Sequence, residues 1–136
     1  HGIDDAMVAA APPIGARLGE LLTFLEDSIL IAHNINFDLA FLDAACRQES
    51  LVMPHFLALD TCAFAKAVLK GERGYSLERL ARVYGLGDGR AHRAEDDART
   101  AARLFELILS RIPDSGSLPM KQIIKLSHTR PFRRTE

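Results

Sequence analysis

The sequence feature that most constrains the fold is a continuous apolar run at residues 29–32, Ile-Leu-Ile-Ala, between two segments with helical periodicity. Such a run is typical of a strand that is buried on both faces, as in a parallel sheet covered by helices. Apolar residues recur at helical spacing over residues 14–26 before the run and over residues 36–49 after it. A buried strand needs neighbouring strands, because unpaired buried backbone groups are costly. The sequence therefore predicts an α/β fold.

The rest of the chain predicts more helices than strands. Residues 1–13 read as a loop, and a short strand is expected at about residues 56–59. Asp60 and Ser76 are expected to cap the helices that follow them, and Gly85 to end the second of these. These two helices and a last, longer one are predicted at residues 62–70, 77–84 and 94–110. The predicted inward faces are Phe37, Ala40, Phe41, Ala44 and Ala45 in the helix at 36–49 and Ala98, Ala101, Ala102, Phe105, Ile108 and Leu109 in the last helix.

Composition narrows the classes of partner and compartment. The chain has 17 Lys and Arg against 18 Asp and Glu, so its overall charge does not indicate a nucleic-acid partner. No apolar run approaches the ~18 residues of a membrane span, and we expect no membrane association. Two cysteines, Cys46 and Cys62, are too few for a disulfide framework and lack metal-site spacing. They favour a reducing, cytoplasmic setting.

Two polar residues follow the predicted strand closely. Ligand sites in α/β folds lie at the carboxyl ends of strands, so Asp38, at the start of a helix, is a candidate for chemistry. A first-turn acid that interacts with the helix dipole is the simpler interpretation, and it is favoured for Asp38 taken alone. For Asn34, an N-cap and a substrate contact are about equally supported.

A second candidate cluster is the segment at residues 92–97, His-Arg-Ala-Glu-Asp-Asp. Glu95 and Asp96 are adequately explained as acids in the first turn of a helix. Asp97 shares the helical phase of the apolar residues, so its carboxylate is predicted to face inward, where an ionised group needs a counter-charge such as a metal ion. His92 taken alone is more often a surface or capping histidine.

One histidine and two separated carboxylates together indicate metal-dependent phosphodiester chemistry. Mg²⁺ prefers oxygen ligands and keeps several waters, so one or two protein carboxylates can suffice per ion. Two ions roughly 3.5–4 Å apart can activate a water and stabilise the leaving oxygen of a phosphodiester. A nearby histidine can accept the proton of that water near neutral pH. Two carboxylates alone would hold two ions poorly.

These segments resemble the motifs of a known family. Residues 32–38, Ala-His-Asn-Ile-Asn-Phe-Asp, resemble the second motif of DEDD-type 3′–5′ exonucleases. Residues 92–97 resemble the third motif, His-x-Ala-x-x-Asp, of the histidine-bearing subgroup. The connecting segments agree as well: residues 1–12 resemble the loop after the third strand, residues 59–61 an Asp-Thr segment and residues 75–80 a Ser-Leu helix. The resemblance covers about residues 1–110 and is strongest to the proofreading epsilon subunit of bacterial DNA polymerase III.

The resemblance implies a ribonuclease H-like exonuclease fold and two bound Mg²⁺ or Mn²⁺ ions. It implies that nucleoside monophosphates are released from the single-stranded 3′ end of DNA, sometimes of RNA, and it allows a DNA polymerase as a partner. The site residues that it implies are the metal ligands Asp38 and Asp97, the general base His92 and the nucleotide contacts His33, Asn34 and Phe37.

The first motif of the family, Asp-x-Glu on the first strand, has no counterpart in residues 1–136. In the family this motif supplies the remaining carboxylates. We therefore expect that the N-terminal strands of the central sheet are missing from this chain and that residues 1–136 alone are inactive. The alternative is a catalytically inactive module that binds nucleic acid or docks to a polymerase. An unrelated helical metal-binding domain is a third, weaker interpretation.

The end of the chain is locally basic. Residues 121–136 hold five Lys or Arg and one acidic residue, after a linker-like Asp-Ser-Gly-Ser run. We predict an exonuclease domain over residues 1–112 and a linker with a basic tail over residues 113–136. A disordered, solvated tail is the favoured interpretation. Contact with phosphates and docking to a polymerase are the alternatives.

Overall fold

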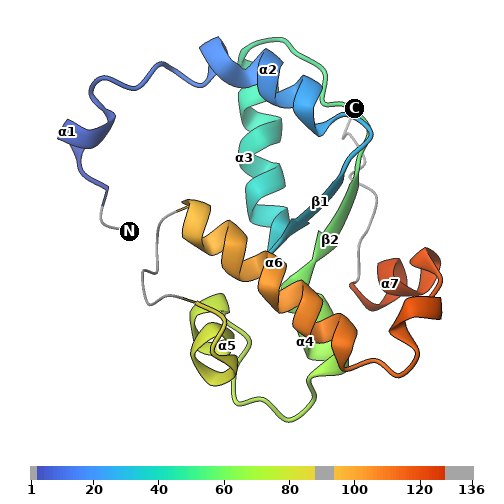
Figure 1. Cartoon of the computed structure of the whole chain (residues 1–136). Coiled ribbons are helices and arrows are strands. Elements are labelled where there is room, and N and C mark those ends of the chain that lie inside the picture. Colours follow the sequence, from blue (N-terminus) through green and yellow to red (C-terminus); the bar gives the residue numbers. More distant parts are fainter. Residues whose placement is uncertain (1–2, 88–93, 128–136) are drawn as a thin grey trace.

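The computed structural model of the chain describes residues 3–87 and 94–127. Strands β1 (Ile29–Ala32) and β2 (Leu57–Asp60) pair in parallel, with Ala32 opposite Asp60, so the segments that follow the two strands start side by side (Figure 1). The first helices are α1 (Asp5–Val8), α2 (Gly15–Leu25), α3 (Ile35–Gln48) and α4 (Thr61–Val68). They are followed by α5 (Leu77–Tyr84), α6 (Ala94–Ser110), a 3₁₀ turn (Ser115–Ser117) and α7 (Met120–Leu126). The bounds predicted for β1, α5 and α6 are confirmed.

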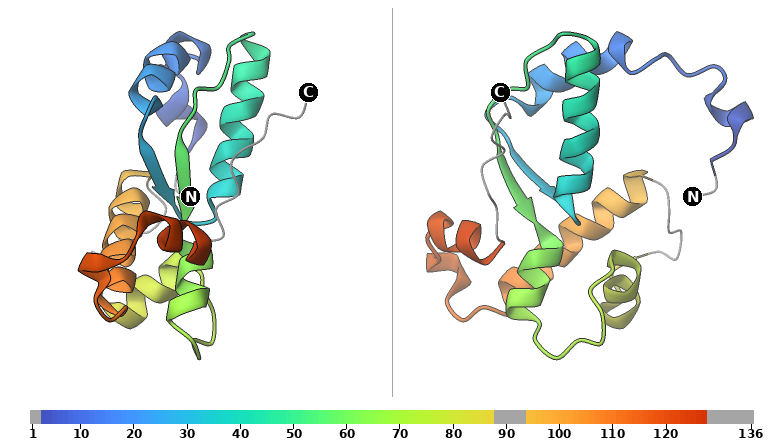
Figure 2. Two further views of the ribbon diagram at one scale, coloured as in Figure 1. Left: turned by 90° about the vertical axis from the view of Figure 1, so that its right-hand side faces the viewer. Right: turned by 180° about the vertical axis from the view of Figure 1, so that it is seen from behind.

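Helices cover both faces of the strand pair. Figure 2 shows α3 on one face and α6 on the other. Successive residues of a strand point to opposite faces, and β2 follows this rule. Ala58 packs with Ile35 and Leu39 of α3, whereas Leu59 belongs to the cluster on the side of α6. This arrangement confirms the predicted α/β fold.

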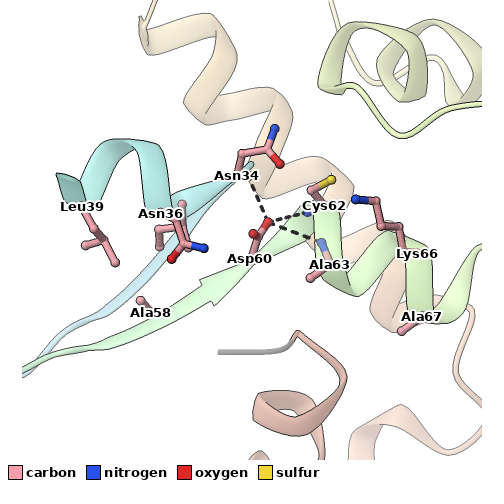
Figure 3. A pocket seen from close by; sticks show the side chains of 10 residues that line it. Asn34, Asn36, Leu39, Ala58, Asp60, Cys62, Ala63, Lys66 and Ala67 are labelled. Carbon is pink, nitrogen blue, oxygen red and sulfur yellow. Dashed lines mark hydrogen bonds between the residues drawn. The ribbon is translucent and has the colours of Figure 1, made fainter. Parts of the chain in front are cut away.

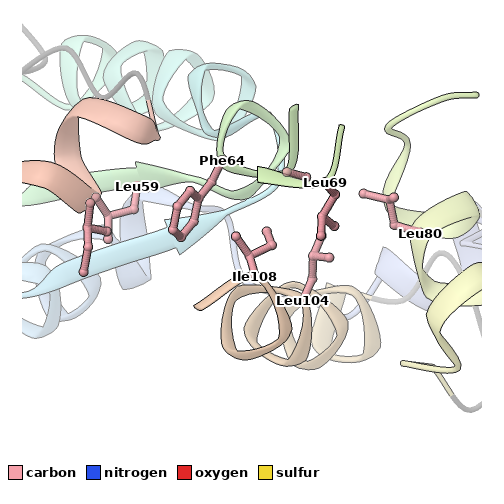
Figure 4. Packing of buried hydrophobic residues seen from close by; sticks show 8 residues of the cluster. Leu59, Phe64, Leu69, Leu80, Leu104 and Ile108 are labelled. Carbon is pink, nitrogen blue, oxygen red and sulfur yellow. The ribbon is translucent and has the colours of Figure 1, made fainter. Parts of the chain in front are cut away.

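The largest hydrophobic cluster joins β2 to four helices. It contains Leu59, Phe64, Ala65, Leu69, Leu80, Leu104, Ile108 and Ile123 (Figure 4). Phe64 of α4, Leu80 of α5 and Leu104 of α6 are fully buried at its centre. Burial of one large apolar side chain contributes roughly 1.5–3 kcal/mol, so this cluster fixes the position of α6 against β2 and α4.

The prediction that residues 29–32 are buried on both faces is wrong in this structure. The strand is present, but Leu30, Ile31 and Ala32 are half-buried and Ile29 is 47% exposed. Within residues 3–87 and 94–127, β1 has a single neighbouring strand. One partner covers only one edge of a strand, so part of the apolar surface of β1 faces solvent.

The predicted inward face of the helix at 36–49 is wrong at four of its five residues, since Phe37, Ala40, Phe41 and Ala44 are exposed and only Ala45 is buried. Phe37 and Phe41 are 67% and 65% exposed, and their rings pack on each other with centroids 4.9 Å apart. The face that packs on the strands and on α2 instead carries Ile35, Leu39, Ala45 and Cys46. On α6 fewer residues differ from the predicted inward face. Ala98 and Ala102 are exposed, whereas Leu104, which was not among the predicted residues, is buried.

Two short helices lie where no helix was predicted. Within the expected loop at residues 1–13, Asp4 caps α1 by accepting a hydrogen bond from the backbone N–H of Met7 at 2.9 Å. In the expected tail, α7 packs against α4 and buries Ile123. The favoured disorder of the tail is therefore wrong for residues 120–126, and residues 128–136 lie outside the described residues. No described helix is long and apolar enough to cross a membrane.

Candidate active site

A left-handed turn connects β1 to α3. Asn34 has φ of 62° and ψ of 48°, a conformation that Asn tolerates better than most residues. Its backbone N–H donates to Oδ1 of Asp60 at 3.1 Å, which holds the turn against the end of β2. Asn34 occupies the N-cap position of α3, but its exposed side chain makes no capping hydrogen bond. The N-cap position considered in the sequence analysis is therefore confirmed, although without a hydrogen bond to the side chain, and the substrate contact stays a prediction.

Asp38 lies in the first turn of α3, just beyond the carboxyl end of β1. Its side chain is exposed, and so is the neighbouring Phe37. The helix dipole favours a carboxylate at this position even without a ligand. Asp38 and Phe37 are thus accessible to a ligand beside the strand ends.

Asp97 lies in the first turn of α6 and is half-buried, as its helical phase predicts. Asp96 is half-buried too, so burial alone does not separate these two acids. Glu95 is exposed and forms an ion pair with Arg99 at 2.7 Å, consistent with an ordinary first-turn acid. His92 lies outside the described residues, and its role as general base stays a prediction.

The helix that carries Asp97 packs against the strand that leads to Asp38. Contacts join α6 to β1, and α3 starts directly after β1 (Figure 1). Within the described ranges, no group of three or more His, Cys, Asp and Glu side chains is placed to hold a metal ion. The structure therefore places one predicted metal ligand, Asp38, in the first turn of α3 and the other, Asp97, in the first turn of α6.

His33 and Asp60 hold the strand ends together. Nδ1 of His33 lies 3.0 Å from Oγ1 of Thr61, and Nε2 lies 2.7 Å from the carbonyl oxygen of Tyr75. Burial lowers the pKa of His33, an effect that the Tyr75 carbonyl and the Asp60 carboxylate oppose. Asp60 was predicted only as a helix cap, a role that is confirmed by hydrogen bonds from the backbone N–H groups of α4. Its link to Asn34 depends on the register of β1 and β2, which the sequence does not specify.

A pocket of about 420 Å³ opens between α3, β2 and α4 (Figure 3). Its lining residues are Asn34, Ile35, Asn36, Leu39, Ala58, Asp60, Cys62, Ala63, Lys66 and Ala67. Of the predicted site residues that the structure describes, Asn34 alone lines the pocket, and Asp38 and Asp97 do not. The pocket therefore lies apart from the predicted metal ligands.

The sequence matches an exonuclease family model and parts of several curated proteins. A family model described as Exonuclease (RNase_T) matches residues 1–105. A PolC-type DNA polymerase III from Thermotoga maritima is 38% identical over 128 residues, which are 94% of this chain and 9% of that protein. The DNA polymerase III subunit epsilon of Treponema pallidum is 36% identical over 113 residues, which are 79% of this chain and 51% of that protein.

A solved structure, exonuclease X in complex with 5′ overhanging duplex DNA, shares the fold. The TM-score is 0.66 at 22% identity, and the match covers 93% of this chain and 69% of the other. The fold and the family match thus define an exonuclease domain with a ribonuclease H-like fold. The chain belongs to the RNase T exonuclease family, which confirms the resemblance to DEDD-type, epsilon-like exonucleases. The chain spans 9% of the length of the Thermotoga maritima protein and 51% of the length of the Treponema pallidum protein.

Proposed function

We propose that the protein containing this chain removes nucleoside monophosphates from the 3′ end of DNA by metal-dependent hydrolysis. The observation that carries this proposal is the packing of α6, which holds Asp97 in its first turn, against β1, which is followed by the helix whose first turn holds Asp38. Two carboxylates from distant parts of the sequence thereby belong to helices that contact the same strand, in a chain of the exonuclease family.

The two carboxylates fit a hard divalent cation. Asp38 is exposed and Asp97 half-buried, and neither pairs with a Lys or Arg among the described residues. Oxygen ligands of this kind suit Mg²⁺ and Mn²⁺. Bound at Asp38 and Asp97, together with further carboxylates, two such ions would activate the attacking water and stabilise the leaving oxygen. His92 would accept the proton of the water.

Substrate contacts follow from the residues around the Asn34 turn. The exposed ring of Phe37 offers a face on which a terminal base can stack. The exposed amide of Asn34 can donate to the terminal nucleotide or accept from it. His33 lies beside these residues, between the ends of the two strands. The names of the relatives further suggest a DNA polymerase as partner, which co-purification with a polymerase subunit would test.

The experiment that tests the activity compares two neighbouring acids in the complete protein. Asp97→Asn should abolish Mn²⁺-dependent cleavage of a single-stranded, 3′-labelled oligonucleotide. Asp96→Asn is the matched control, because Asp96 is also half-buried in the first turn of α6, and it should retain cleavage. Asp38→Asn should behave like Asp97→Asn.

Two results would contradict the proposal. Equal activity of the Asp96→Asn and Asp97→Asn variants would remove the specific role of Asp97. Oligonucleotide binding that is insensitive to EDTA, without turnover in the complete protein, would favour the catalytically inactive binding or docking module.

A further inference from the structure

Both ring nitrogens of His33 are engaged within the chain. Nε2 lies 2.7 Å from the carbonyl oxygen of Tyr75, and Nδ1 lies 3.0 Å from the hydroxyl oxygen of Thr61. A carbonyl oxygen only accepts hydrogen bonds, so Nε2 must carry a proton. The fully buried hydroxyl of Thr61 also lies 3.2 Å from the carbonyl oxygen of Ala32. The ring is thus part of a network that reaches the last residue of β1.

The network joins three segments that are distant in sequence. His33 directly follows β1, Thr61 is the first residue of α4, and Tyr75 precedes Ser76, the N-cap of α5. Helix α5 in turn packs against α6, which holds Asp97 in its first turn. His33 therefore connects the turn before α3 to the part of the fold that carries α5 and α6.

We propose that His33 is a positioning residue, whose two hydrogen bonds fix the turn that carries Asp38 relative to α4 and α5. This inference rests on the proposed function of Asp38. The turn is held at two successive residues, because the backbone N–H of Asn34 is bound by Asp60 while the ring of His33 is bound by Thr61 and Tyr75. A shift of Asp38 by a fraction of an ångström would misplace any group that its carboxylate binds.

The single hydroxyl proton of Thr61 can go either to Nδ1 of His33 or to the carbonyl oxygen of Ala32, so the direction of this bond follows the protonation of the ring. In the neutral ring with a proton on Nε2, Nδ1 accepts the hydroxyl proton of Thr61. A doubly protonated ring would donate from both nitrogens and leave the Thr61 hydroxyl to donate to Ala32. The charged groups that act on the ring are Asp60 and Lys66. Because burial lowers the pKa of His33 and the Tyr75 carbonyl needs a donor, histidine NMR of the wild-type protein at pH 7.5 should show a neutral ring protonated on Nε2.

Two substitutions separate positioning from contact with a nucleotide. His33→Gln keeps an N–H group that can reach Tyr75, whereas His33→Phe keeps a flat ring without donors. In the complete protein we expect His33→Phe to lower kcat about 10- to 100-fold with a change in KM below about 3-fold. His33→Gln should recover most of the lost kcat. A His33→Phe variant with wild-type kcat, or a His33→Gln variant that is equally impaired, would overturn the proposal.

A second measurement does not need activity. Amide hydrogen exchange at residues 34–38 should be about 10-fold faster in His33→Phe and nearly unchanged in His33→Gln, since the turn opens more often without its hydrogen bonds. Unchanged exchange in His33→Phe would overturn the positioning role. If the wild-type protein does not cleave DNA, the proposed function fails, while the exchange rates still decide the role of His33.

Discussion

The carboxylate of Asp60 accepts a hydrogen bond from the backbone N–H of Asn34, across the ends of the two paired strands, at 3.1 Å. The same oxygen accepts from the backbone N–H groups of Cys62 and Ala63 at 2.8 and 3.4 Å. One oxygen atom thus stabilises the first turn of α4 and the turn that leads into α3. Because both segments depend on it, Asp60 should matter more than an ordinary helix cap.

We predict that Asp60→Ala lowers the free energy of unfolding by about 1–3 kcal/mol, since it removes a helix cap and a tie between two segments. Urea denaturation measures this loss. Asp60→Asn keeps an oxygen acceptor and should lose less. Ser76→Ala is the comparison for a simple cap, because the side chain of Ser76 accepts one hydrogen bond, from the backbone N–H of Arg79 at 3.4 Å. Equal losses for Asp60→Ala and Ser76→Ala would show that the link to Asn34 is of no consequence.

The cluster around α6 gives a second prediction. Leu104→Ala should lower the free energy of unfolding by about 2–5 kcal/mol, because it leaves a cavity between α4, α5 and α6. Thermal and urea denaturation can both detect a change of this size. Glu106→Ala on the same helix is exposed and should change stability by less than about 0.5 kcal/mol. A tolerated Leu104→Ala would mean that the packing shown in Figure 4 is wrong.

The exposed aromatic ring beside Asp38 gives a third prediction. Phe37→Ala should weaken binding of single-stranded DNA by about 1–3 kcal/mol if a base stacks on the ring. Fluorescence anisotropy with a labelled oligonucleotide, in a variant lacking cleavage, measures this effect. Phe24→Ala is the matched control, since Phe24 is 80% exposed but lies on α2. The same loss in both variants would point to a general apolar effect instead of stacking at Phe37.

A fourth prediction concerns pH. Burial lowers the pKa of His33 from its ordinary 6.5, so the unfolded chain binds this proton more readily than the folded one. The free energy of unfolding should therefore fall as the pH drops through 6.5, and the contribution of His33 should be absent well above that pH. Urea denaturation between pH 5 and 8 tests this dependence. The slope should shrink in His33→Gln and persist in His55→Gln, whose side chain is exposed; an unchanged slope in His33→Gln would refute the assignment.

The sequence predicted where helices and strands lie along the chain better than it predicted which of their residues face the core. Local signals sufficed for β1, α5 and α6, since apolar runs, Ser76 and Gly85 define where these elements begin and end. The inward face of α3 was wrong because periodicity favoured the large aromatic rings, whereas the narrow space over Ala58 is filled by Ile35 and Leu39. Which residues face a sheet depends on the neighbouring layers, and a single sequence does not describe them.

In the candidate site, too, the positions of single residues could be predicted from the sequence, whereas the contacts between distant residues could not. Asp38 was chosen from its place after the predicted strand and Asp97 from its helical phase, and the structure places both in the first turns of helices. The links of His33 to Tyr75 and of Asp60 to Asn34 span 42 and 26 residues. Such contacts follow from strand register and helix packing, so no local pattern could predict them.

The position of α7 has a practical consequence for work with this protein. A fragment cut after α6 would lose Ile123, whose side chain is buried in the same cluster as Leu104 and Phe64. The freshly uncovered apolar surface would favour association between molecules in solution. Expression boundaries for this domain should therefore extend through Ser127, beyond the region that the exonuclease family shares.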